Sequence, residues 1–316
     1  MEANPKLYIS DLAYTLGSSH SLTELKSDSK QDEIDFLLGA GLDNFRKSVK
    51  STEELAYDAA ANTLGKKRWD PGAIDALVFS TTILSLEGSP FKIREIDRIL
   101  YDFNLTKAYP LGYFLSNCAN LIGAVKFAAS LIRSGDHQTV LVVVSDKMVK
   151  DERRFMGSNE SILSDGAVAF ILSAAAGEYE LLHYIQKIDP SYISEQFNVT
   201  GYLKRAAAGI KHTFHELARL DNAEISHYRK VFIGNYNLMV QRIYRNELGL
   251  TDKQMFLENI PRIGHVFSAD LFINFSDFIN RDAVKTGDLF GFIGIGPSRW
   301  EAFSLKKSDQ LQEGGL

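Results

Sequence analysis

The sequence contains one cysteine, Cys118, in a setting typical of reactive thiols. The segment that follows, 119–132, is apolar nearly all round, as expected for a helix buried in a core. Cys118 would lie at its N-terminus, where backbone N–H groups lack partners and the helix dipole is positive. That position favours the nucleophilic thiolate, and the same N–H groups can hold an oxyanion during acyl transfer. From these residues alone two interpretations stay open: a nucleophile, or a small buried apolar side chain.

The segments around Cys118 alternate between buried strands and helices, which predicts an α/β protein. Strands with continuous apolar runs, typical of sheets covered on both faces, are expected at Ile74–Thr81, Thr139–Ser145 and Ala167–Leu172. Helices are expected at Thr52–Leu64, Cys118–Arg133, Arg205–Leu220, Leu238–Leu248 and Ser268–Ile279, the last of which Ser268 can cap. Further strands are expected at Leu7–Ser10, Lys230–Ile233, Asp288–Ile293 and Trp300–Leu305. The order repeats, so we predict an N-terminal half at 1–175 and a C-terminal half at 176–316.

Composition excludes several classes of protein. The 316 residues carry 35 basic and 40 acidic side chains, a net charge of −5, so there is no bulk electrostatic footprint for nucleic acid. No apolar run reaches the roughly 18–20 residues of a membrane span, and the N-terminus lacks the regions of a signal peptide. One cysteine excludes an intrachain disulfide and a multi-cysteine zinc site. We expect a cytoplasmic protein without a metal site.

Five sequence blocks resemble the thiolase superfamily, specifically ketoacyl synthase III and its relatives, over residues 6–305. They are GAIDALVFSTT (72–82), LSNCANLIGA (115–124) around Cys118, SILSDGAVAFIL (161–172) with Asp165-Gly166, IGHVFSAD (263–270) and KTGDLFGFIGIGPSRW (285–300). The blocks occur in the family's order. The resemblance implies Cys118 as the nucleophile. It also implies a thiolase fold, with duplicated α/β/α/β/α layers related by pseudo-two-fold symmetry, in a homodimer.

The chain departs from the family at two catalytic positions. Where ketoacyl synthases III carry a proline-histidine-glutamine-alanine-asparagine run, this chain has Gly234-Asn235-Tyr236-Asn237, so the histidine becomes Gly234. The family's second catalytic residue, an asparagine after glycine, is His265 here. In the family these two residues polarise the malonyl thioester carbonyl and drive decarboxylation. The usual carbon–carbon bond formation is therefore not expected from this site.

His265 is followed five residues later by Asp270. This pattern resembles a subgroup of ketoacyl-synthase-III-like acyltransferases in which a cysteine or serine, a histidine and an aspartate form a triad. The resemblance implies that Cys118, His265 and Asp270 pass an acyl group to an alcohol or amine, in secondary metabolism. An acid that orients the ring would stabilise its charged form. The alternative for Asp270 is an acid that only stabilises the start of a helix.

Other positions complete the expected site. Gly294 and Gly296 resemble the family's glycine pair that faces the cysteine, so one of them is expected to form the oxyanion hole with the Cys118 N–H. Asn235 and Asn237 are candidate substrate ligands that hydrogen-bond a thioester or pantetheine amide, or else satisfy loop backbone. The donor is expected to be a phosphopantetheine thioester on an acyl carrier protein, or a coenzyme A thioester. No permanently bound cofactor is expected.

The leading hypothesis is therefore an acyltransferase that forms a Cys118 thioester and passes the acyl group to a small-molecule hydroxyl or amine. A condensing enzyme that makes a carbon–carbon bond is the first alternative. A catalytically silent subunit of a heterodimeric synthase is the second. The residues identify neither the acyl group nor the acceptor.

Overall fold

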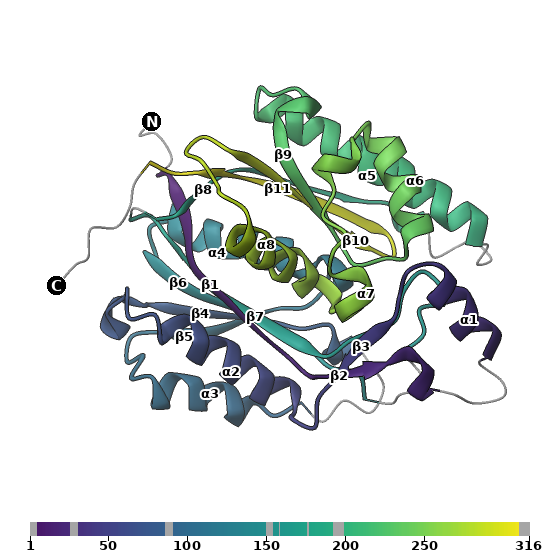
Figure 1. Ribbon diagram of the computed structural model, residues 1–316. Coiled ribbons are helices and arrows are strands. Elements are labelled where there is room, and N and C mark those ends of the chain that lie inside the picture. Colours follow the sequence, from purple (N-terminus) through teal and green to yellow (C-terminus); the bar gives the residue numbers. More distant parts are fainter. Residues whose placement is uncertain are drawn as a thin grey trace.

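The computed structural model describes residues 5–25, 31–85, 91–149, 154–157, 159–175, 177–191 and 199–309. Within these residues nine strands form one sheet in the order β5-β4-β6-β7-β1-β8-β11-β10-β9, and β2 and β3 form a separate pair. In Figure 1 the two ends of the large sheet lie on opposite sides of the helices α4 and α8. Helices α2 and α3 cover the outer face at one end, and α5 and α6 cover it at the other.

The strands have bounds that match most of the predicted ones. They are β1 Leu7–Leu16, β2 Ser18–Ser21, β3 Asn44–Lys47, β4 Ala76–Ser80, β5 Tyr109–Tyr113, β6 Thr139–Asp146, β7 Gly166–Ser173, β8 Tyr179–Ile188, β9 Tyr228–Ile233, β10 Leu289–Gly296 and β11 Arg299–Lys307. The α-helices are α1 Gln31–Gly39, α2 Thr52–Leu64, α3 Ile93–Asp102, α4 Asn120–Arg133, α5 Val199–Leu220, α6 Leu238–Leu248, α7 Ile260–Ile263 and α8 Asp270–Arg281.

The strand order repeats within the sheet. From one edge it runs β5-β4-β6-β7-β1, and from the other it runs β9-β10-β11-β8. The pairs nearest each edge, β5–β4 and β4–β6 in the first series and β9–β10 in the second, are parallel. The pairs that follow are antiparallel. Among the described residues, no strand in the second series takes the place that β5 has in the first. β9 has only a single parallel bridge on that side, between Val231 and Met255. The predicted α/β fold with duplicated layers is therefore confirmed, and the predicted boundary at 175/176 falls between β7 and β8.

The helix α4 is buried because it lies between the two parts of the sheet. It packs against β4 and β6 on one side and against β10 and β11 on the other. Its residues Leu121, Ile122, Ala124 and Val125 have no exposed surface. The nearly all-round apolar sequence of 119–132 is the consequence. The helix ends at Arg133, where the sequence predicted its end, and after the C-cap Ser134 the chain turns at Gly135, whose φ is 86°.

One predicted helix start is wrong. Ser268 does not cap α8, because the chain first makes a 3-10 turn over Phe267–Ala269 (η10) and the helix begins at Asp270. Ser268 is buried inside that turn and its side chain gives no cap hydrogen bond.

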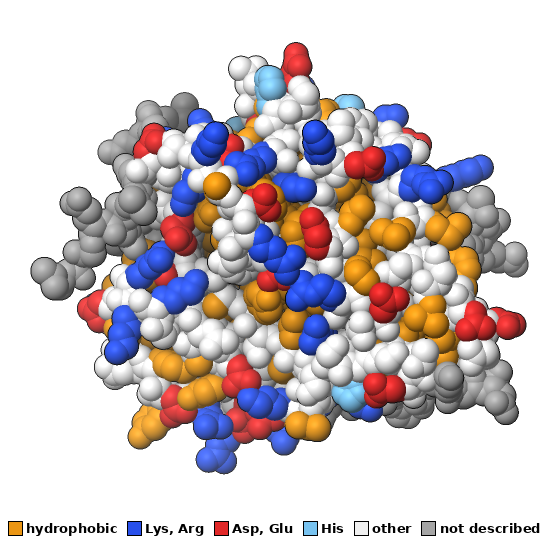
Figure 2. All heavy atoms as spheres, viewed as in Figure 1, with side chains coloured by type: hydrophobic (Ala, Val, Ile, Leu, Met, Phe, Trp, Pro, Cys, Tyr) orange, Lys and Arg blue, Asp and Glu red, His pale blue; other side chains and the backbone are white. Residues whose placement is uncertain are grey.

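The described helices include none that is both long and apolar enough to cross a membrane. On the face shown in Figure 2, acidic and basic side chains are interspersed and hydrophobic ones lie between them.

Candidate active site

Cys118 lies in a short 3-10 turn, Asn117–Ala119 (η5), that leads into α4. The turn is tight because Asn117 adopts a left-handed conformation with a φ of 49°, which asparagine tolerates better than most residues. The Ala119 N–H donates to the Ser116 carbonyl at 3.0 Å, whereas no bond from the Cys118 N–H is found among the described residues. The prediction needs one correction: α4 begins at Asn120, and the partly exposed Cys118 precedes the helix.

A chain of buried polar side chains braces this turn. The Asn120 carboxamide accepts from the Ser116 N–H at 2.8 Å and donates to the Thr82 hydroxyl at 3.3 Å. Asp146, at the end of β6, accepts from the Thr82 N–H at 2.5 Å and from the Thr81 hydroxyl at 3.0 Å. Burial raises the pKa of Asp146 to about 7, although these hydrogen bonds oppose the shift. The ends of β4 and β6 thus fix the conformation of the nucleophile turn.

His265 is held in the loop between α7 and α8 by its own backbone. The loop opens at Gly264, whose φ is 70°, a conformation that glycine adopts without steric cost. The His265 N–H donates to the Ile162 carbonyl at 2.8 Å, and the His265 carbonyl accepts from the Ser164 N–H at 2.8 Å. The side chain is almost fully buried. The imidazole therefore has a defined position with little freedom to move.

Asp270, the first residue of α8, reaches back across the loop to His265. Its Oδ2 atom bonds the Nδ1 atom of the imidazole, and its Oδ1 atom accepts from the Val266 N–H at 2.7 Å. The carboxylate has no exposed surface. The contact predicted between the two side chains is present, and it leaves the Nε2 atom of His265 as the nitrogen available for chemistry.

Opposing effects set the protonation of His265. Burial disfavours the charged ring and on its own would lower the pKa. Charge attraction and the hydrogen bond from Asp270, with an added contribution from Cys118, outweigh burial and raise the pKa to about 10. The Cys118 sulfur thus contributes to the raised pKa of His265. It does not meet hydrogen-bond geometry, because Nε2 has no hydrogen-bond partner among the described residues. At neutral pH this pKa makes the ring an imidazolium beside the Cys118 sulfur.

Asn235 holds the carboxylate of Asp270. Its backbone N–H donates to Asp270 at 2.6 Å and its side-chain amide donates to Asp270 at 3.2 Å and to the Gly264 carbonyl at 2.8 Å. Its side-chain oxygen accepts from the Asn274 amide at 2.8 Å. Because all its polar atoms have protein partners, we no longer expect Asn235 to bind substrate.

Asn237 is the N-cap of α6. Its side-chain oxygen accepts from the N–H groups of Met239 at 2.9 Å and Val240 at 3.0 Å, a common arrangement at the start of a helix. Its amide donates to the Asn159 carbonyl at 2.7 Å. The expectation that Asn237 binds substrate is corrected accordingly: the side chain satisfies local backbone.

Gly294 and Gly296 bring the end of β10 against the nucleophile turn. A Cβ atom at position 294 would lie 3.0 Å from the Cα atom of Ala119, and one at 296 would lie 2.7 Å from the Ser116 carbonyl oxygen. A larger residue would push the strand away from the turn. The strand end therefore lies where an oxyanion hole needs it, and the N–H that completes the hole stays a prediction.

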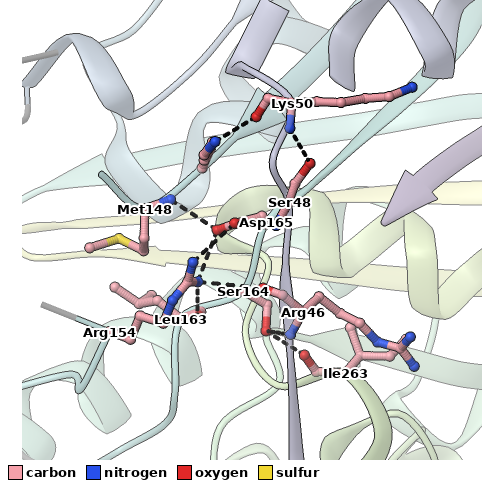
Figure 3. A network of polar contacts seen from close by, with 10 residues as sticks. Arg46, Ser48, Lys50, Met148, Arg154, Leu163, Ser164, Asp165 and Ile263 are labelled. Atoms are coloured by element: carbon pink, nitrogen blue, oxygen red, sulfur yellow. Dashed lines mark hydrogen bonds and ion pairs between the residues drawn. The ribbon is translucent and has the colours of Figure 1, made fainter. Parts of the chain in front are cut away.

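A second buried network anchors the strand beside His265. Arg154 and Asp165 form a paired contact at 2.9 and 3.0 Å, with the two side chains pointing toward one another in Figure 3. Asp165 also accepts from the N–H groups of Ser48 at 2.8 Å and Met148 at 3.0 Å. The neighbouring Ser164 bonds the His265 backbone, so this network positions the imidazole from a distance.

Sequence patterns did not reveal the hydrogen-bond network of Asn120, Thr82 and Asp146, or the buried carboxyl of Glu160. Asn120 was visible as a polar exception in an apolar helix. Glu160 carried no such signal, because its 4% exposure results from long-range packing.

The sequence is similar to one family model and to individual relatives. The family model for 3-oxoacyl-[acyl-carrier-protein (ACP)] synthase III matches residues 115–190, which contain Cys118 and Asp165. The β-ketoacyl-[acyl-carrier-protein] synthase III of Staphylococcus haemolyticus is 21% identical over 272 residues, covering 81% of this chain and 84% of that protein. A relative from Staphylococcus epidermidis is 22% identical over 275 residues, with the same coverage.

Solved structures share the fold over nearly the whole chain. An acyltransferase, ChlB3, has a TM-score of 0.82 at 16% identity and covers 96% of this chain and 98% of its own. The 3-oxoacyl-[acyl-carrier-protein] synthase III of Aquifex aeolicus has a TM-score of 0.79 at 17% identity, with 95% and 99% covered. OleA of Xanthomonas campestris, in a cerulenin-bound form, has a TM-score of 0.78 at 14% identity, with 96% and 99% covered. The thiolase fold predicted from sequence is confirmed.

Proposed function

Because the chain is a ketoacyl-synthase-III-like protein with the thiolase fold, we propose that it transfers acyl groups through a thioester on Cys118. One observation carries the proposal: in this buried arrangement Asp270 binds the Nδ1 atom of His265, and Cys118 helps to raise the pKa of the same ring. A cysteine, a base and a group that orients the base are the parts needed for covalent acyl transfer.

The reactive state of the proposed cycle is an ion pair of a Cys118 thiolate and the His265 imidazolium. The raised pKa of His265 supports this state, because Asp270 and Cys118 both stabilise the charged ring. A thiolate attacks without first losing a proton. His265 therefore begins the cycle as an acid.

The first half-reaction takes the acyl group from the donor thioester. The Cys118 thiolate attacks the carbonyl carbon, and the resulting oxyanion is held by the Cys118 N–H and an N–H at Gly294 or Gly296. When the intermediate collapses, the carbon–sulfur bond of the donor breaks and the leaving thiolate takes the proton from His265. The products are acyl-Cys118, a free donor thiol and a neutral imidazole.

The second half-reaction delivers the acyl group to a hydroxyl or amine. The neutral His265 accepts the acceptor's proton at Nε2 while the acceptor's oxygen or nitrogen attacks the acyl carbon. Collapse of the intermediate releases the Cys118 thiolate, which pairs again with the imidazolium. Asp270 stays bound to Nδ1 throughout and stabilises the charged ring at the start and end.

A condensing enzyme remains the first alternative, because the relatives include β-ketoacyl synthases. We favour transfer to oxygen or nitrogen, since the family's histidine position is Gly234 and His265 is bound to Asp270. A condensing enzyme would release carbon dioxide from a malonyl thioester. The silent-subunit alternative predicts a mixed complex whose activity survives Cys118→Ala.

The donor we propose is a phosphopantetheine thioester of an acyl carrier protein or a coenzyme A thioester, with a homodimer as the working form. The names of the relatives support the carrier protein, since they act on acyl-carrier-protein substrates. Intact-protein mass spectrometry tests the central claim. After incubation with a short acyl-pantetheine thioester, wild type should gain one acyl mass and Cys118→Ala none. Wild type that never acylates contradicts the proposal.

A further inference from the structure

Glu160 places a carboxyl group in the buried interior beside His265. Its side chain is 4% exposed, and its Oε1 atom has no hydrogen-bond partner among the described residues. The backbone is fixed instead: the Glu160 carbonyl accepts from the Asn237 N–H at 2.7 Å, and the Ser161 hydroxyl donates to the Asn235 carbonyl at 2.6 Å. Among the described residues, Oε1 of the carboxyl group therefore makes no hydrogen bond that holds the fold.

The backbone brings Glu160 close to His265, because the carbonyl of Ile162, two residues further along the chain, accepts from the His265 N–H at 2.8 Å. Burial raises the pKa of Glu160 to about 7, and the charge of His265 opposes that shift. A buried carboxyl without a partner is destabilising, and native proteins rarely leave such a group unsatisfied. This is the pattern expected of a group whose partner is a ligand.

The other buried carboxyls near the nucleophile are already committed. Asp270 bonds His265, Val266 and Asn235. Asp146 accepts from Thr82, and Glu301, which is also buried, accepts from the Gln186 amide at 3.0 Å. Glu160 is thus the carboxyl of this centre that is left for a substrate.

The number of protons that an acceptor must lose distinguishes the candidate acceptors. An alcohol loses one proton when it is acylated, and the neutral His265 accepts it. A primary amine arrives protonated near neutral pH and must lose two protons to become an amide. A site with a second proton acceptor beside the imidazole is therefore matched to an amine.

Building on the proposed acyl transfer, we propose that Glu160 binds the ammonium group of a primary-amine acceptor and removes its first proton. The ionised carboxylate pairs with the ammonium and takes one proton, which gives a carboxylic acid and a free amine. The amine nitrogen attacks the acyl-Cys118 carbonyl, His265 takes the second proton, and the Cys118 thiolate leaves. Glu160 returns its proton to solvent when the amide departs.

The test uses single-turnover discharge of pre-formed acyl-enzyme, so that differences in acylation do not enter. Acyl-Cys118 is prepared with an acyl-pantetheine thioester and exposed to a panel of primary amines of two to eight carbons and to the alcohols with the same skeletons. We expect wild type to prefer amines, and Glu160→Gln to lower the amine-to-alcohol ratio of rates at least tenfold. Glu160→Asp, which keeps the charge, should retain part of the preference, and Glu258→Gln, which changes an exposed acid, should retain all of it.

A pH profile separates this role from a structural one. The titratable groups around the centre are Cys118, His265, Asp270, Asp146, Glu301 and Glu160. Wild-type amine discharge should rise with pH around 7 as Glu160 ionises, and Glu160→Gln should lose that rise. An acyl-enzyme that no amine discharges faster than its matching alcohol overturns the proposal, as does an unchanged ratio in Glu160→Gln. Wild type that never forms acyl-Cys118 is a different result, which contradicts the proposed function itself.

Discussion

A Cβ atom at position 234 would lie 3.1 Å from the Cε1 atom of His265 and 3.4 Å from its Nδ1 atom. The ring of Tyr236 lies 5.2 Å from the His265 ring, centroid to centroid, and confines the imidazole further. The imidazole thus lies beside the end of β9, next to the position where ketoacyl synthases III carry their own histidine. The two departures from the family pattern are therefore coupled, because glycine at 234 leaves room for His265.

Gly234→Ala should slow acylation of Cys118 by about tenfold. The added methyl group would displace the imidazole by a few tenths of an ångström, and small misplacements of catalytic groups lower rates steeply. The rate of acyl-enzyme formation, followed by mass spectrometry, measures the effect. Gly39→Ala is the matched control, because a Cβ atom there meets nothing within 4 Å. Equal rates in wild type and Gly234→Ala would show that the ring tolerates the contact.

Asp270→Asn should lower the acylation rate at pH 7 by about a hundredfold or more, as in triads whose aspartate is neutralised. The raised pKa of His265 depends on Asp270, and burial would then favour the neutral ring. Without the imidazolium, Cys118 loses the partner of its thiolate. The rate of alkylation by iodoacetamide between pH 6 and 10 reports the thiolate directly. Asp282→Asn, which changes an exposed acid, controls for surface charge, and a wild-type alkylation profile in Asp270→Asn would exclude the ion pair.

Glu160→Gln should be more stable than wild type above pH 7. The folded-state pKa of Glu160 is raised to about 7, so the folded protein binds a proton that the unfolded chain releases near pH 4. The folded state therefore loses stability as pH rises through the interval from about 4 to 7, by about 3–4 kcal/mol for this group. Urea unfolding between pH 4 and 9 should show the two curves meeting at low pH and separating above it. Parallel curves would mean that Glu160 has a partner in the folded protein.

Local signals predicted some elements to the residue. The bounds of α2 follow from the capping box of Ser51 and Glu54, and α6 ends before Gly249, which adopts a left-handed φ of 69°. Asn237 carried the same kind of signal, since asparagine favours the N-cap position. The sequence left substrate binding and local backbone bonding open for Asn237, and its hydrogen bonds are those of an N-cap.

Long-range packing decided what local patterns could not show. The hydroxyl of Ser268 suggested a cap, but the turn at Phe267 and the return of Asp270 to His265 move the helix start by two residues. The contacts of Asn235 come from two distant segments of the chain, Ser161 and residues 264–274. The family resemblance supplied Cys118 and His265, whereas the spatial relation of Gly234 to His265 appears only in the folded chain.

Arg154→Met should destabilise the protein by about 3–5 kcal/mol, because it leaves the buried charge of Asp165 without its main partner. Arg98→Met is a suitable comparison, since Arg98 pairs with Asp102 on the surface, where such pairs contribute about 1 kcal/mol or less. Urea unfolding of the two variants measures the difference. Similar losses in both would contradict a structural role for the pair shown in Figure 3.

The edge strand β5 is expected to join two copies of the chain. β4 is its partner in the sheet, so its outer N–H and C=O groups form an edge that another strand can extend. Two large apolar side chains are exposed on and just after this strand, Tyr109 at 67% and Leu115 at 78%. Light scattering should give wild type about twice the monomer mass of 35.3 kDa. The double substitution Tyr109→Glu with Leu115→Glu should give the monomer, because charges on an edge oppose strand pairing. Tyr101→Glu, on the exposed face of α3, should leave the dimer intact. A monomeric wild type, or a double variant that stays dimeric, would place the interface elsewhere.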